Sequence, residues 1–322
     1  MKTPAFWDKK SSILSRLLMP VGRIYAWTVA RRFKRTKPYQ APVPVICVGN
    51  ISVGGTGKTP VCLALMKILK EHGFFFLNHG YKSKIKNVLV DSNTHTPFDV
   101  GDEAMMLAAH ATTVVDNHRA RGAQLAVKCG AKGIIMDDGF QNPSLIKTLS
   151  FVVVDGKKGF GNECVLPAGP LREPAPKGLK RADGVIIVGE DTWGVRFYLQ
   201  RHKVDLPILT GRFVPDAKML AELQGQKVFA FAGLGNPNKF FDTLSEAGVE
   251  IIGTQVFPDH YFYTRFDIEE MKQKSGGVPL ITTTKDAVKL TGELANNILV
   301  LSGDFVFDDL NEVHAVLKEV LK

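Results

Sequence analysis

The chain has 322 residues, of which 45% are hydrophobic and 23% are charged. This composition is typical of a globular protein and excludes a disordered chain, a fibrous repeat and a small disulfide-stabilised scaffold. At roughly 150 residues per domain, the length predicts about two domains. The formal net charge is +9, and residues 1–40 account for all of it, with ten Lys or Arg against the single acid Asp8. A basic arm of this kind implies an anionic partner surface.

The N-terminal arm, residues 1–40, contains a predicted amphipathic helix. Between residues 11 and 33, apolar side chains recur at helical spacing with arginines among them. The longest uncharged run there has seven residues, whereas a membrane span needs about 20, and Arg16 interrupts any signal-peptide core. Three interpretations stay open: a helix on a membrane surface with Tyr25 and Trp27 at the interface, an ordinary helix packed on its own domain, and a nucleic-acid contact, which no aromatic–basic pattern supports.

The four cysteines lie far apart in the sequence and form no CxxC pair. They are Cys47, Cys62, Cys129 and Cys164. This spacing predicts neither a zinc site nor a disulfide framework. Free thiols are typical of a reducing compartment, so we expect the protein to face the cytosol.

The body of the chain alternates short apolar runs with amphipathic stretches. Val- and Ile-rich runs are typical of strands that are buried on both faces of a parallel sheet. We expect strands at 43–48, 74–77, 88–90, 113–116, 133–136, 151–154 and 185–188, and helices at 59–71, 102–110, 119–129 and 192–202. After residue 225 we expect strands at 227–232, 250–256, 279–283 and 298–301, and helices at 237–247, 267–274 and 310–321. This alternation predicts βαβ units.

The most specific pattern is the segment VGNISVGGTGKTP at 48–60, where an apolar strand enters a Gly-rich turn and a helix follows. Such a loop wraps phosphate groups with backbone N–H groups. Lys58 is expected to reach the β- and γ-phosphates of a nucleotide, and Thr59 to bind Mg²⁺. The pattern GxxxxGK[ST] is met except at its first position, where Ser52 replaces Gly. The expected nucleotide-binding residues are Ser52, Val53, Gly54, Gly55, Thr56, Gly57, Lys58 and Thr59.

A P-loop enzyme also needs an acidic group for the metal at the end of a neighbouring strand. Asp137 and Asp138 follow the apolar run 133–136 and meet this requirement. The alternative is a turn cap at Asp138 and Gly139. Residues 284–286, TKD, resemble the guanine-reading motif [NT]KxD, but their acid stands one position early, which favours ATP.

These features predict an α/β fold with two domains. Residues 41–205 form the expected P-loop NTPase-like α/β/α domain with a mostly parallel sheet, and residues 226–322 a second, smaller α/β domain. Residues 206–225 are the expected linker. The second domain is expected to close an active-site cleft.

Phosphoryl transfer to a hydroxyl needs a base near the γ-phosphate. Asp102, in VGDEA (100–104), opens a predicted helix and is either that base or an N-cap. His260, in FPDHY (257–261), either orients the base from the second domain or is only structural. A base and its partner on opposite cleft walls make catalysis depend on domain closure. Arg119 is either a phosphate ligand or part of a surface ion pair, and Glu173 lies in a Pro/Gly-rich loop that is either functional or merely well ordered.

Together these segments resemble the tetraacyldisaccharide 4′-kinase family of lipid A synthesis. The matching segments run in the family's order: VGNISVGGTGKTP (48–60), GDE (101–103), DDGFQ (137–141), LPAGPLREP (166–174), FAGLGNP (231–237), FPDH (257–260) and TTKDAVKL (283–290). The resemblance implies transfer of the γ-phosphate of ATP, with Mg²⁺, to the 4′-hydroxyl of tetraacyldisaccharide 1-phosphate. It also implies a peripheral location at the cytoplasmic face of the inner membrane of Gram-negative bacteria.

The resemblance further implies roles for individual residues. Asp102 becomes the catalytic base, paired with His260. The implied catalytic residues are Asp102, His260, Lys58, Arg119 and Glu173, and the implied metal ligands are Thr59, Asp137 and Asp138. The implied partners are a lipid substrate and, through residues 1–40, a membrane surface, with neither nucleic acid nor an obligate protein partner.

Four places depart from the family's pattern. Asn78 and His79 stand where Ser and Arg are usual, Ala104 where Pro is usual, Asn142 where His is usual, and Thr284 where Glu is usual. These departures concern the acceptor side more than the reaction. Two alternative functions stay open: a membrane-recruited P-loop ATPase switch without lipid kinase activity, and a kinase or ATP-dependent ligase for a small soluble substrate.

Overall fold

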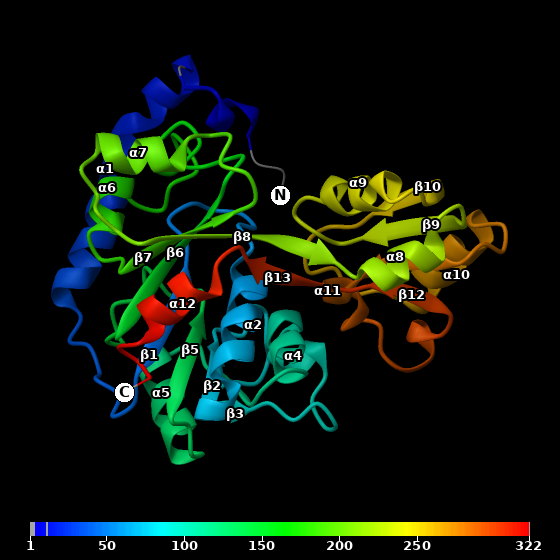
Figure 1. Ribbon diagram of the computed structural model, residues 1–322, viewed down its shortest axis with the longest axis horizontal. Helices are drawn as coiled ribbons and strands as arrows, with labels where there is room; N and C mark the ends of the chain where they lie inside the picture. Colours follow the sequence, from blue (N-terminus) through cyan, green and yellow to red (C-terminus); the bar gives the residue numbers. More distant parts are fainter. Residues whose placement is uncertain (1–3, 11, 322) are drawn as a thin grey trace.

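The chain folds into two lobes, each built on its own β-sheet (Figure 1). The computed structural model describes residues 4–10 and 12–321. The larger sheet has nine strands in the order β13-β8-β7-β6-β1-β5-β2-β4-β3, and the smaller has four in the order β10-β9-β11-β12. The predicted α/β class with a mostly parallel main sheet is confirmed.

The larger sheet is parallel except at its two edges. Its strands are β1 (Val45–Gly49), β2 (Phe74–Asn78), β3 (Val88–Leu89), β4 (Thr113–Val115), β5 (Gly133–Asp137), β6 (Leu149–Asp155), β7 (Gly184–Val188), β8 (Ile208–Pro215) and β13 (Gly303–Phe307). Only β3 with β4 and β13 with β8 pair antiparallel. Every residue of β1, β5 and β7 is buried, as the Val- and Ile-rich sequences predict for strands covered on both faces.

Helices cover both faces of the larger sheet. One face carries α2 (Lys58–Leu69), α4 (Asp102–Ala108) and α12 (Leu310–Leu317), and the other carries α5 (Arg119–Lys128), α6 (Ala175–Leu179) and α7 (Val195–Arg201). Alternate residues of β1 enter the two cores, since Ile46 packs with α2 and Cys47 with the opposite layer. The short helix α3 (Pro97–Val100) leads into α4.

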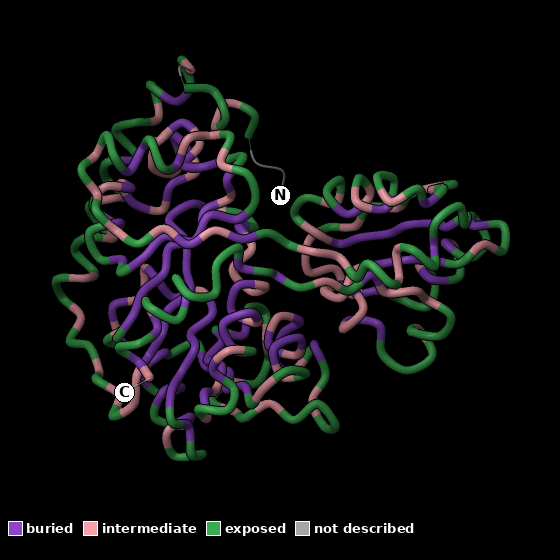
Figure 2. Tube along the Cα trace, viewed as in Figure 1, coloured by how far each residue is buried: buried purple, intermediate pink, exposed green. Residues whose placement is uncertain are grey.

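The smaller lobe has a separate core, visible as a second set of buried strands in Figure 2. Its parallel strands are β9 (Lys227–Ala232), β10 (Glu250–Val256), β11 (Leu280–Thr283) and β12 (Ile298–Leu301). Helices α8 (Ala217–Leu223) and α9 (Asn238–Glu246) pack on one face, and α10 (Arg265–Lys274) packs on the other. Helix α11 (Thr284–Ala287) follows β11 directly.

The structure differs from the predicted domain boundaries in two places. Residues 206–225 are not a free linker, because they contain β8 and α8. Residues 303–321 belong to the larger lobe, because β13 pairs with β8 in the nine-stranded sheet and Val313 and Leu317 of α12 are buried in its core. The two lobes are therefore joined by two chain crossings: β8 runs toward the smaller lobe, and β13 returns antiparallel beside it (Figure 1).

The N-terminal arm contains a short 3₁₀ turn, η1 (Ala5–Asp8), and the helix α1 (Ile13–Arg35), which lies along the larger lobe on the side away from the smaller lobe (Figure 1). Position 11, where the predicted helix begins, lies outside the described residues. Only Ser15 and Gly22 of α1 are buried. Asn162 Nδ2 donates a hydrogen bond to Ser15 Oγ (2.9 Å), and a Cβ on Gly22 would lie 2.8 Å from Val165 O. The helix therefore packs on the loop around 162–165 through a narrow stripe.

Candidate active site

The P-loop, residues 50–59, connects β1 to α2 at the carboxyl end of the larger sheet. Asn50 Nδ2 donates to Thr56 Oγ1 (3.2 Å) and to Gly54 O (3.4 Å), which fixes the turn from inside. Gly54 and Gly57 have φ values of 109° and 90°, which side chains with a Cβ rarely adopt. Apart from the neighbours in the chain, no described residue has an atom within 4 Å of a Cβ placed on Gly54 or Gly55, so the loop backbone is open to an incoming group. This shape suits phosphate binding at a helix N-terminus.

The loop at 166–174 braces the start of the P-loop. Val53 N donates to Pro170 O (2.8 Å), and Arg172 N donates to Ile51 O (2.7 Å). Ser52 pairs with Leu171 through an isolated bridge. Val53 was predicted to bind the nucleotide, but its N–H group already donates a hydrogen bond within the protein.

Asp137, the last residue of β5, lies between the P-loop and β2. Its Oδ2 accepts from Thr59 Oγ1 (3.1 Å) and Asn78 Nδ2 (3.4 Å), and its Oδ1 accepts from Cys62 Sγ (3.6 Å). Burial raises the pKa of Asp137 to about 7, and the nearby charge of Glu103 acts in the same direction. A cation bound beside this carboxyl would favour its charged form.

Asp138 turns toward the cationic side of the site. Its φ of 49° places it in the left-handed region, and its Oδ2 lies 3.7 Å from both Lys58 Nζ and Arg172 Nη2. Burial acts to raise the pKa of Asp138, but the charges of Lys58, Arg172 and Arg119 outweigh it and hold that pKa below its ordinary value. Asp138 therefore combines a turn conformation with an ionised carboxylate beside the P-loop lysine.

Arg119, at the start of α5, is 2% exposed and lies behind the two acids. Its guanidinium donates to Leu77 O (3.4 Å), Asp137 O (2.9 Å) and Asp138 O. It thus holds the ends of β2 and β5 together and adds positive charge beneath the acids. The ion pair of this helix is made instead by the half-exposed Arg121, whose Nε lies 2.6 Å from Oδ2 of the buried Asp116.

Glu173 is buried and connects three segments of the site. Both of its carboxylate oxygens accept from Arg181 Nη2 at 2.8 Å. Its Oε1 also accepts from Gln141 Nε2 (3.0 Å), which donates in addition to Asn50 O (2.8 Å). Glu173 thereby ties the loop at 166–174 to the base of the P-loop.

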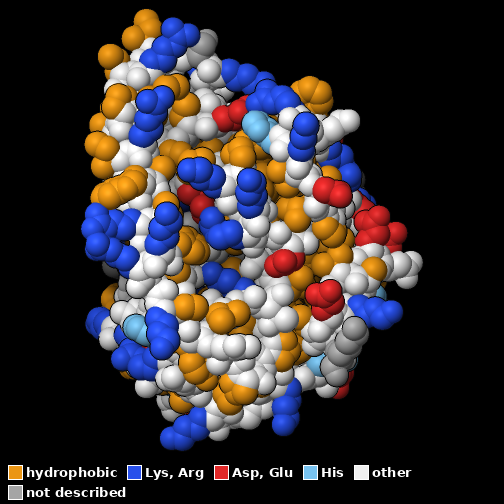
Figure 3. All heavy atoms as spheres, turned by 90° about the vertical axis from the view of Figure 1, so that its left-hand side faces the viewer, with side chains coloured by type: hydrophobic (Ala, Val, Ile, Leu, Met, Phe, Trp, Pro, Cys, Tyr) orange, Lys and Arg blue, Asp and Glu red, His pale blue; other side chains and the backbone are white. Residues whose placement is uncertain are grey.

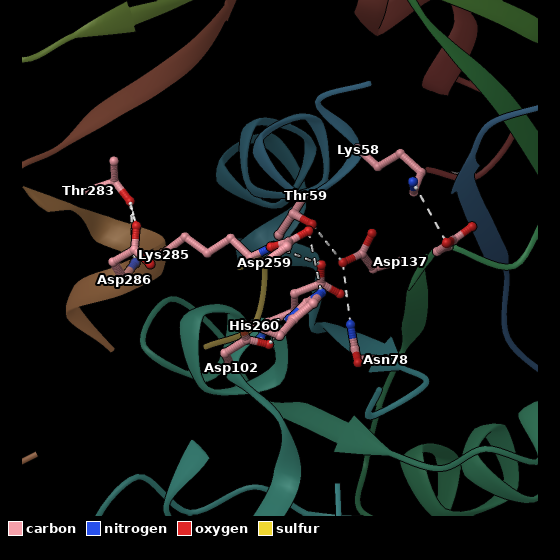
Figure 4. Close-up of polar contacts among 12 residues, drawn as sticks. Lys58, Thr59, Asn78, Asp102, Asp137, Asp259, His260, Thr283, Lys285 and Asp286 are labelled. Atoms are coloured by element: carbon pink, nitrogen blue, oxygen red, sulfur yellow. Dashed lines mark hydrogen bonds and ion pairs between the residues drawn. The ribbon is translucent and has the colours of Figure 1, made fainter. Parts of the chain in front are cut away.

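Asp102 and His260 meet although they come from different lobes (Figure 4). His260 Nδ1 lies 2.8 Å from Asp102 Oδ2 and 3.0 Å from Oδ1. Gly101, at φ 95°, separates α3 from α4 and lets Asp102 start the second helix; a Cβ there would lie 3.0 Å from Tyr81 O. Burial acts to raise the pKa of Asp102, but the hydrogen bond and charge of His260 outweigh it, so this pKa lies below its ordinary value.

His260 is held in the same region by further contacts. Its backbone has a φ of 59°, an uncommon conformation for a residue with a side chain. The ring of Tyr81 lies 5.0 Å from its imidazole, centroid to centroid, and the rings of Phe98 and Phe262 stack across the lobes at 3.9 Å. The cleft is therefore closed at this point by contacts from both sides.

Three charged residues at the junction of the lobes received no role from the sequence. Lys285 Nζ lies 3.0 Å from Asp259 Oδ1 and 3.7 Å from Glu103 Oε1. Each belongs to a matching segment, and Glu103 and Asp259 are the chain neighbours of Asp102 and His260. Their position in those segments was the only available signal, because nothing in the local sequence indicates a contact between Glu103 and Lys285, which are 182 residues apart.

Of the departures from the family pattern, only Asn78 and His79 lie beside Asp137 and Asp138, the two acids at the end of β5. Asn78 donates to Asp137, as described, and its Oδ1 accepts from Gly80 N (2.7 Å). Ala104 is buried in the small core behind α4, and Asn142 Oδ1 accepts from Ser144 N (2.9 Å) within a local turn. Thr284 begins α11.

The oxygen donors at the P-loop fit Mg²⁺. Among residues 4–10 and 12–321, no group of three or more His, Cys, Asp or Glu side chains is arranged to hold a metal ion. Mg²⁺ does not need such a set, since it usually takes one or two carboxylates together with phosphate oxygens and water. Thr59 and Asp137 supply adjacent hard donors, with Asp138 next in the chain. Arg172 Nε is buried without an acceptor in the described part of the chain. Buried donors are usually paired, so this N–H group is suited to an anion bound at the site.

The outer surface of α1 is both apolar and cationic (Figure 3). Its exposed large apolar side chains are Ile13, Leu14, Leu17, Met19, Val21, Ile24, Tyr25 and Trp27. Its charged residues are Arg16, Arg23, Arg31, Arg32, Lys34 and Arg35, with no acid among them. No described helix is sufficiently long and apolar to span a bilayer.

The comparisons with known proteins agree with one another. The family model described as tetraacyldisaccharide-1-P 4′-kinase matches residues 14–322. The chain is 46% identical to the tetraacyldisaccharide 4′-kinase of Paramagnetospirillum magneticum, over 96% of this chain and 95% of that protein. It is 43% identical to that of Rhodospirillum rubrum, over 100% and 98%. A crystal structure of LpxK from Aquifex aeolicus in complex with ATP is 28% identical, with a TM-score of 0.76 over 96% of this chain and 100% of that one. The chain therefore belongs to the tetraacyldisaccharide-1-P 4′-kinase family.

Proposed function

We propose that this kinase transfers the γ-phosphate of ATP to the 4′-hydroxyl of tetraacyldisaccharide 1-phosphate, at the cytoplasmic face of the bacterial inner membrane. The observation that carries the proposal is the meeting of Asp102 and His260 at 2.8 Å beside a P-loop whose Thr59 is bound to Asp137. A phosphate-binding loop alone fits many ATPases. A buried carboxylate–imidazole pair that needs both lobes fits transfer to an acceptor held between them.

The donor side is assigned to the larger lobe. The backbone N–H groups of residues 54–59 and the ammonium of Lys58 bind the phosphates. Thr59, Asp137 and Asp138 are the residues that would hold Mg²⁺, which when bound neutralises charge on the phosphate oxygens. Arg119 and Glu173 support this arrangement from behind, through the backbone of the two acids and through Gln141.

The acceptor side is assigned to the Asp102–His260 pair. Asp102 is the base that accepts the proton of the attacking hydroxyl, and its lowered pKa keeps it ionised at neutral pH. His260 donates from Nδ1 and thereby fixes the orientation of the carboxylate. Phosphoryl transfer has a loose transition state, so orientation of the hydroxyl contributes more than early removal of its proton.

The membrane surface is assigned to α1. A helix with exposed apolar side chains and only cationic charges lies in the headgroup plane of an anionic membrane. Each Lys or Arg near such a surface contributes about 1 kcal/mol of attraction. Binding in this way keeps the protein at the bilayer that holds the acyl chains of the substrate.

The proposed activity is tested by the structure of the product. The protein is incubated with tetraacyldisaccharide 1-phosphate in mixed micelles with ATP and Mg²⁺, and the lipid is analysed by ³¹P NMR and mass spectrometry. We expect one added phosphate monoester at the 4′ position. A phosphate at another hydroxyl, or an unchanged lipid, contradicts the proposal.

The proposed membrane contact is tested with charge substitutions on α1. Leu17 and Ile24 are 71% and 63% exposed, so Leu17→Glu and Ile24→Glu leave the fold intact. We expect both to reduce binding to anionic phospholipid vesicles and to raise KM for the lipid, with unchanged affinity for ATP. Phe266→Glu is the matched control, because Phe266 is 73% exposed but lies on α10 of the smaller lobe. Equal vesicle binding by all four proteins contradicts the assignment.

A further inference from the structure

Lys285, on the smaller lobe, contacts the chain neighbours of the Asp102–His260 pair: Asp259 of its own lobe and Glu103 of the larger lobe. In Figure 4 its side chain extends from α11 toward Asp259, which precedes His260. Its ammonium also faces Glu103, which follows Asp102. Two contacts therefore lie side by side across the cleft: the carboxylate–imidazole pair itself, and a lysine between the carboxylates that flank it.

Lys285 offsets the negative charges that flank the Asp102–His260 pair. The imidazole of His260 lies between two carboxylates, with Asp102 Oδ2 at 2.8 Å from Nδ1 and Asp259 Oδ2 at 3.8 Å from Nε2. Glu103, next to Asp102 on α4, adds a third carboxylate at 3.7 Å from Lys285 Nζ. Burial acts to lower the pKa of Lys285, but the charges of Glu103 and Asp259 outweigh it, so that pKa lies above its ordinary value and the ammonium stays charged. Without Lys285, closure would bring Glu103 and Asp259 toward each other without the cation that contacts both of them.

A buried hydrogen-bond network around Asp286 holds helix α11 in place. Asp286, next to Lys285, is fully buried and accepts from Lys289 Nζ (2.7 Å), Tyr263 OH (2.9 Å) and Gly233 N (3.1 Å). Its second oxygen accepts from the hydroxyl of Thr283 (2.9 Å), the N-cap of the helix. Removing one partner of a buried ionic network is costly, so this network holds α11, and with it the stem of Lys285, against the core of the lobe.

We infer that Lys285 is a positioning residue for the proposed transfer: by contacting Asp259 and Glu103 together, it keeps His260 of one lobe aligned with Asp102 of the other. This inference rests on the proposed function. Lys285 acts through the pair and not on the nucleotide, so its removal is expected to change turnover and not the binding of ATP.

The test compares three variants of the full chain in the lipid kinase assay. Lys285→Met removes the charge and keeps most of the stem; we expect kcat to fall about tenfold or more, with the Kd for ATP within about twofold of wild type. Lys285→Arg keeps a cation that can contact two carboxylates, so we expect it to recover most of kcat. Lys239→Met is the matched control. Lys239 also joins the lobes, through Asp155 at 3.8 Å, but Asp155 ends β6, on the other side of β1 from β5 and β2. We expect wild-type turnover from it.

Four results overturn the inference: wild-type kcat in Lys285→Met, a loss of ATP affinity as large as the loss of kcat, an arginine variant as impaired as the methionine variant, or an equal loss in Lys239→Met. If Lys285→Met does not fold, Asp259→Asn removes the nearer partner instead. We then expect reduced kcat at unchanged ATP affinity, and unchanged kcat overturns the inference. Failure of the proposed function is distinguishable, because the wild-type protein itself then phosphorylates no lipid.

Discussion

Replacing Asp102 by Asn isolates the charge of the proposed base. The two side chains have nearly the same shape, and the site is 4% exposed, so the neighbouring atoms need not move. The amide oxygen can still accept from His260 Nδ1, which lies 2.8 and 3.0 Å from the two carboxylate oxygens. The variant therefore keeps the contact between the lobes but has no ionised carboxylate to accept a proton.

We expect Asp102→Asn to lower kcat strongly and to change the affinity for ATP and the stability only slightly. A positioned general base contributes about 10²–10⁴-fold, which corresponds to about 2.7–5.4 kcal/mol of activation free energy at about 1.36 kcal/mol per tenfold. We expect kcat of Asp102→Asn to fall by this factor. The Kd for ATP should stay within about threefold, because the phosphate contacts assigned to the P-loop do not involve Asp102. Loss of a negative charge at the first turn of α4 costs only about 0.3–1 kcal/mol of stability.

The assay measures kcat and lipid KM in micelles and the Kd for ATP separately, for Asp102→Asn, His260→Gln and the double variant. Residues that act as a unit give non-additive losses. We therefore expect the double variant to be little slower than Asp102→Asn alone. The reasoning is refuted if the affinity for ATP falls as much as kcat, if kcat falls less than tenfold, or if the losses of the single variants multiply.

Three further predictions concern the nucleotide, the metal and stability. Lys58→Ala is expected to weaken ATP binding and turnover together, measured by titration calorimetry and label transfer; an unchanged Kd contradicts the assigned role. Chelation of Mg²⁺ with EDTA is expected to abolish transfer, with recovery on adding excess Mg²⁺, whereas residual transfer in EDTA argues against the metal. Asp116→Asn is expected to lower the free energy of unfolding by about 1–3 kcal/mol, because a buried carboxylate then no longer pairs with Arg121. Burial acts to raise the pKa of Asp116, but its hydrogen bonds with Arg121 and His118 N outweigh this, so the folded pKa lies below the ordinary 3.8. The stabilisation is thus present above about pH 4 and is lost as the pH falls through the folded value; urea unfolding at several pH values that shows a constant difference refutes this.

The features of the fold that depend on local sequence were predictable. The P-loop needs glycines at backbone angles that other residues rarely adopt, and a lysine at the start of a helix. The sequence pattern therefore predicts the shape of the loop directly. The strands β1, β5 and β7 are buried on both faces, and their uninterrupted apolar sequences indicate this directly.

The path of the chain between the lobes was not predictable in this way. β8 has a mixed pattern of burial, and its partner β13 is about 90 residues away. Which sheet a strand joins depends on packing against distant elements, here the burial of Val313 of α12 beside α2. Local propensity carries no information on that choice.

The candidate site shows the same division. Asp102 and His260 are 158 residues apart. Their residue types suggested a base and its orienter on opposite cleft walls, and the family resemblance favoured that pairing over the structural alternatives. Arg119 and Glu173 were predicted to support the metal or phosphate site. Which atoms they would contact could not be predicted, since their hydrogen bonds go to the backbone of the acids and to Arg181 and Gln141. Contacts such as Lys285 with Glu103 arise only when the lobes meet, so no pattern along the chain indicates them.

The most direct measurement follows ADP and labelled lipid in one reaction. The wild-type protein and Lys58→Ala are each incubated with γ-labelled ATP, Mg²⁺ and tetraacyldisaccharide 1-phosphate in mixed micelles, and both products are quantified over time. A lipid kinase gives ADP and labelled lipid in equal amounts, and both disappear in the Lys58→Ala reaction. ADP without labelled lipid contradicts the proposed function and favours a membrane-recruited ATPase switch.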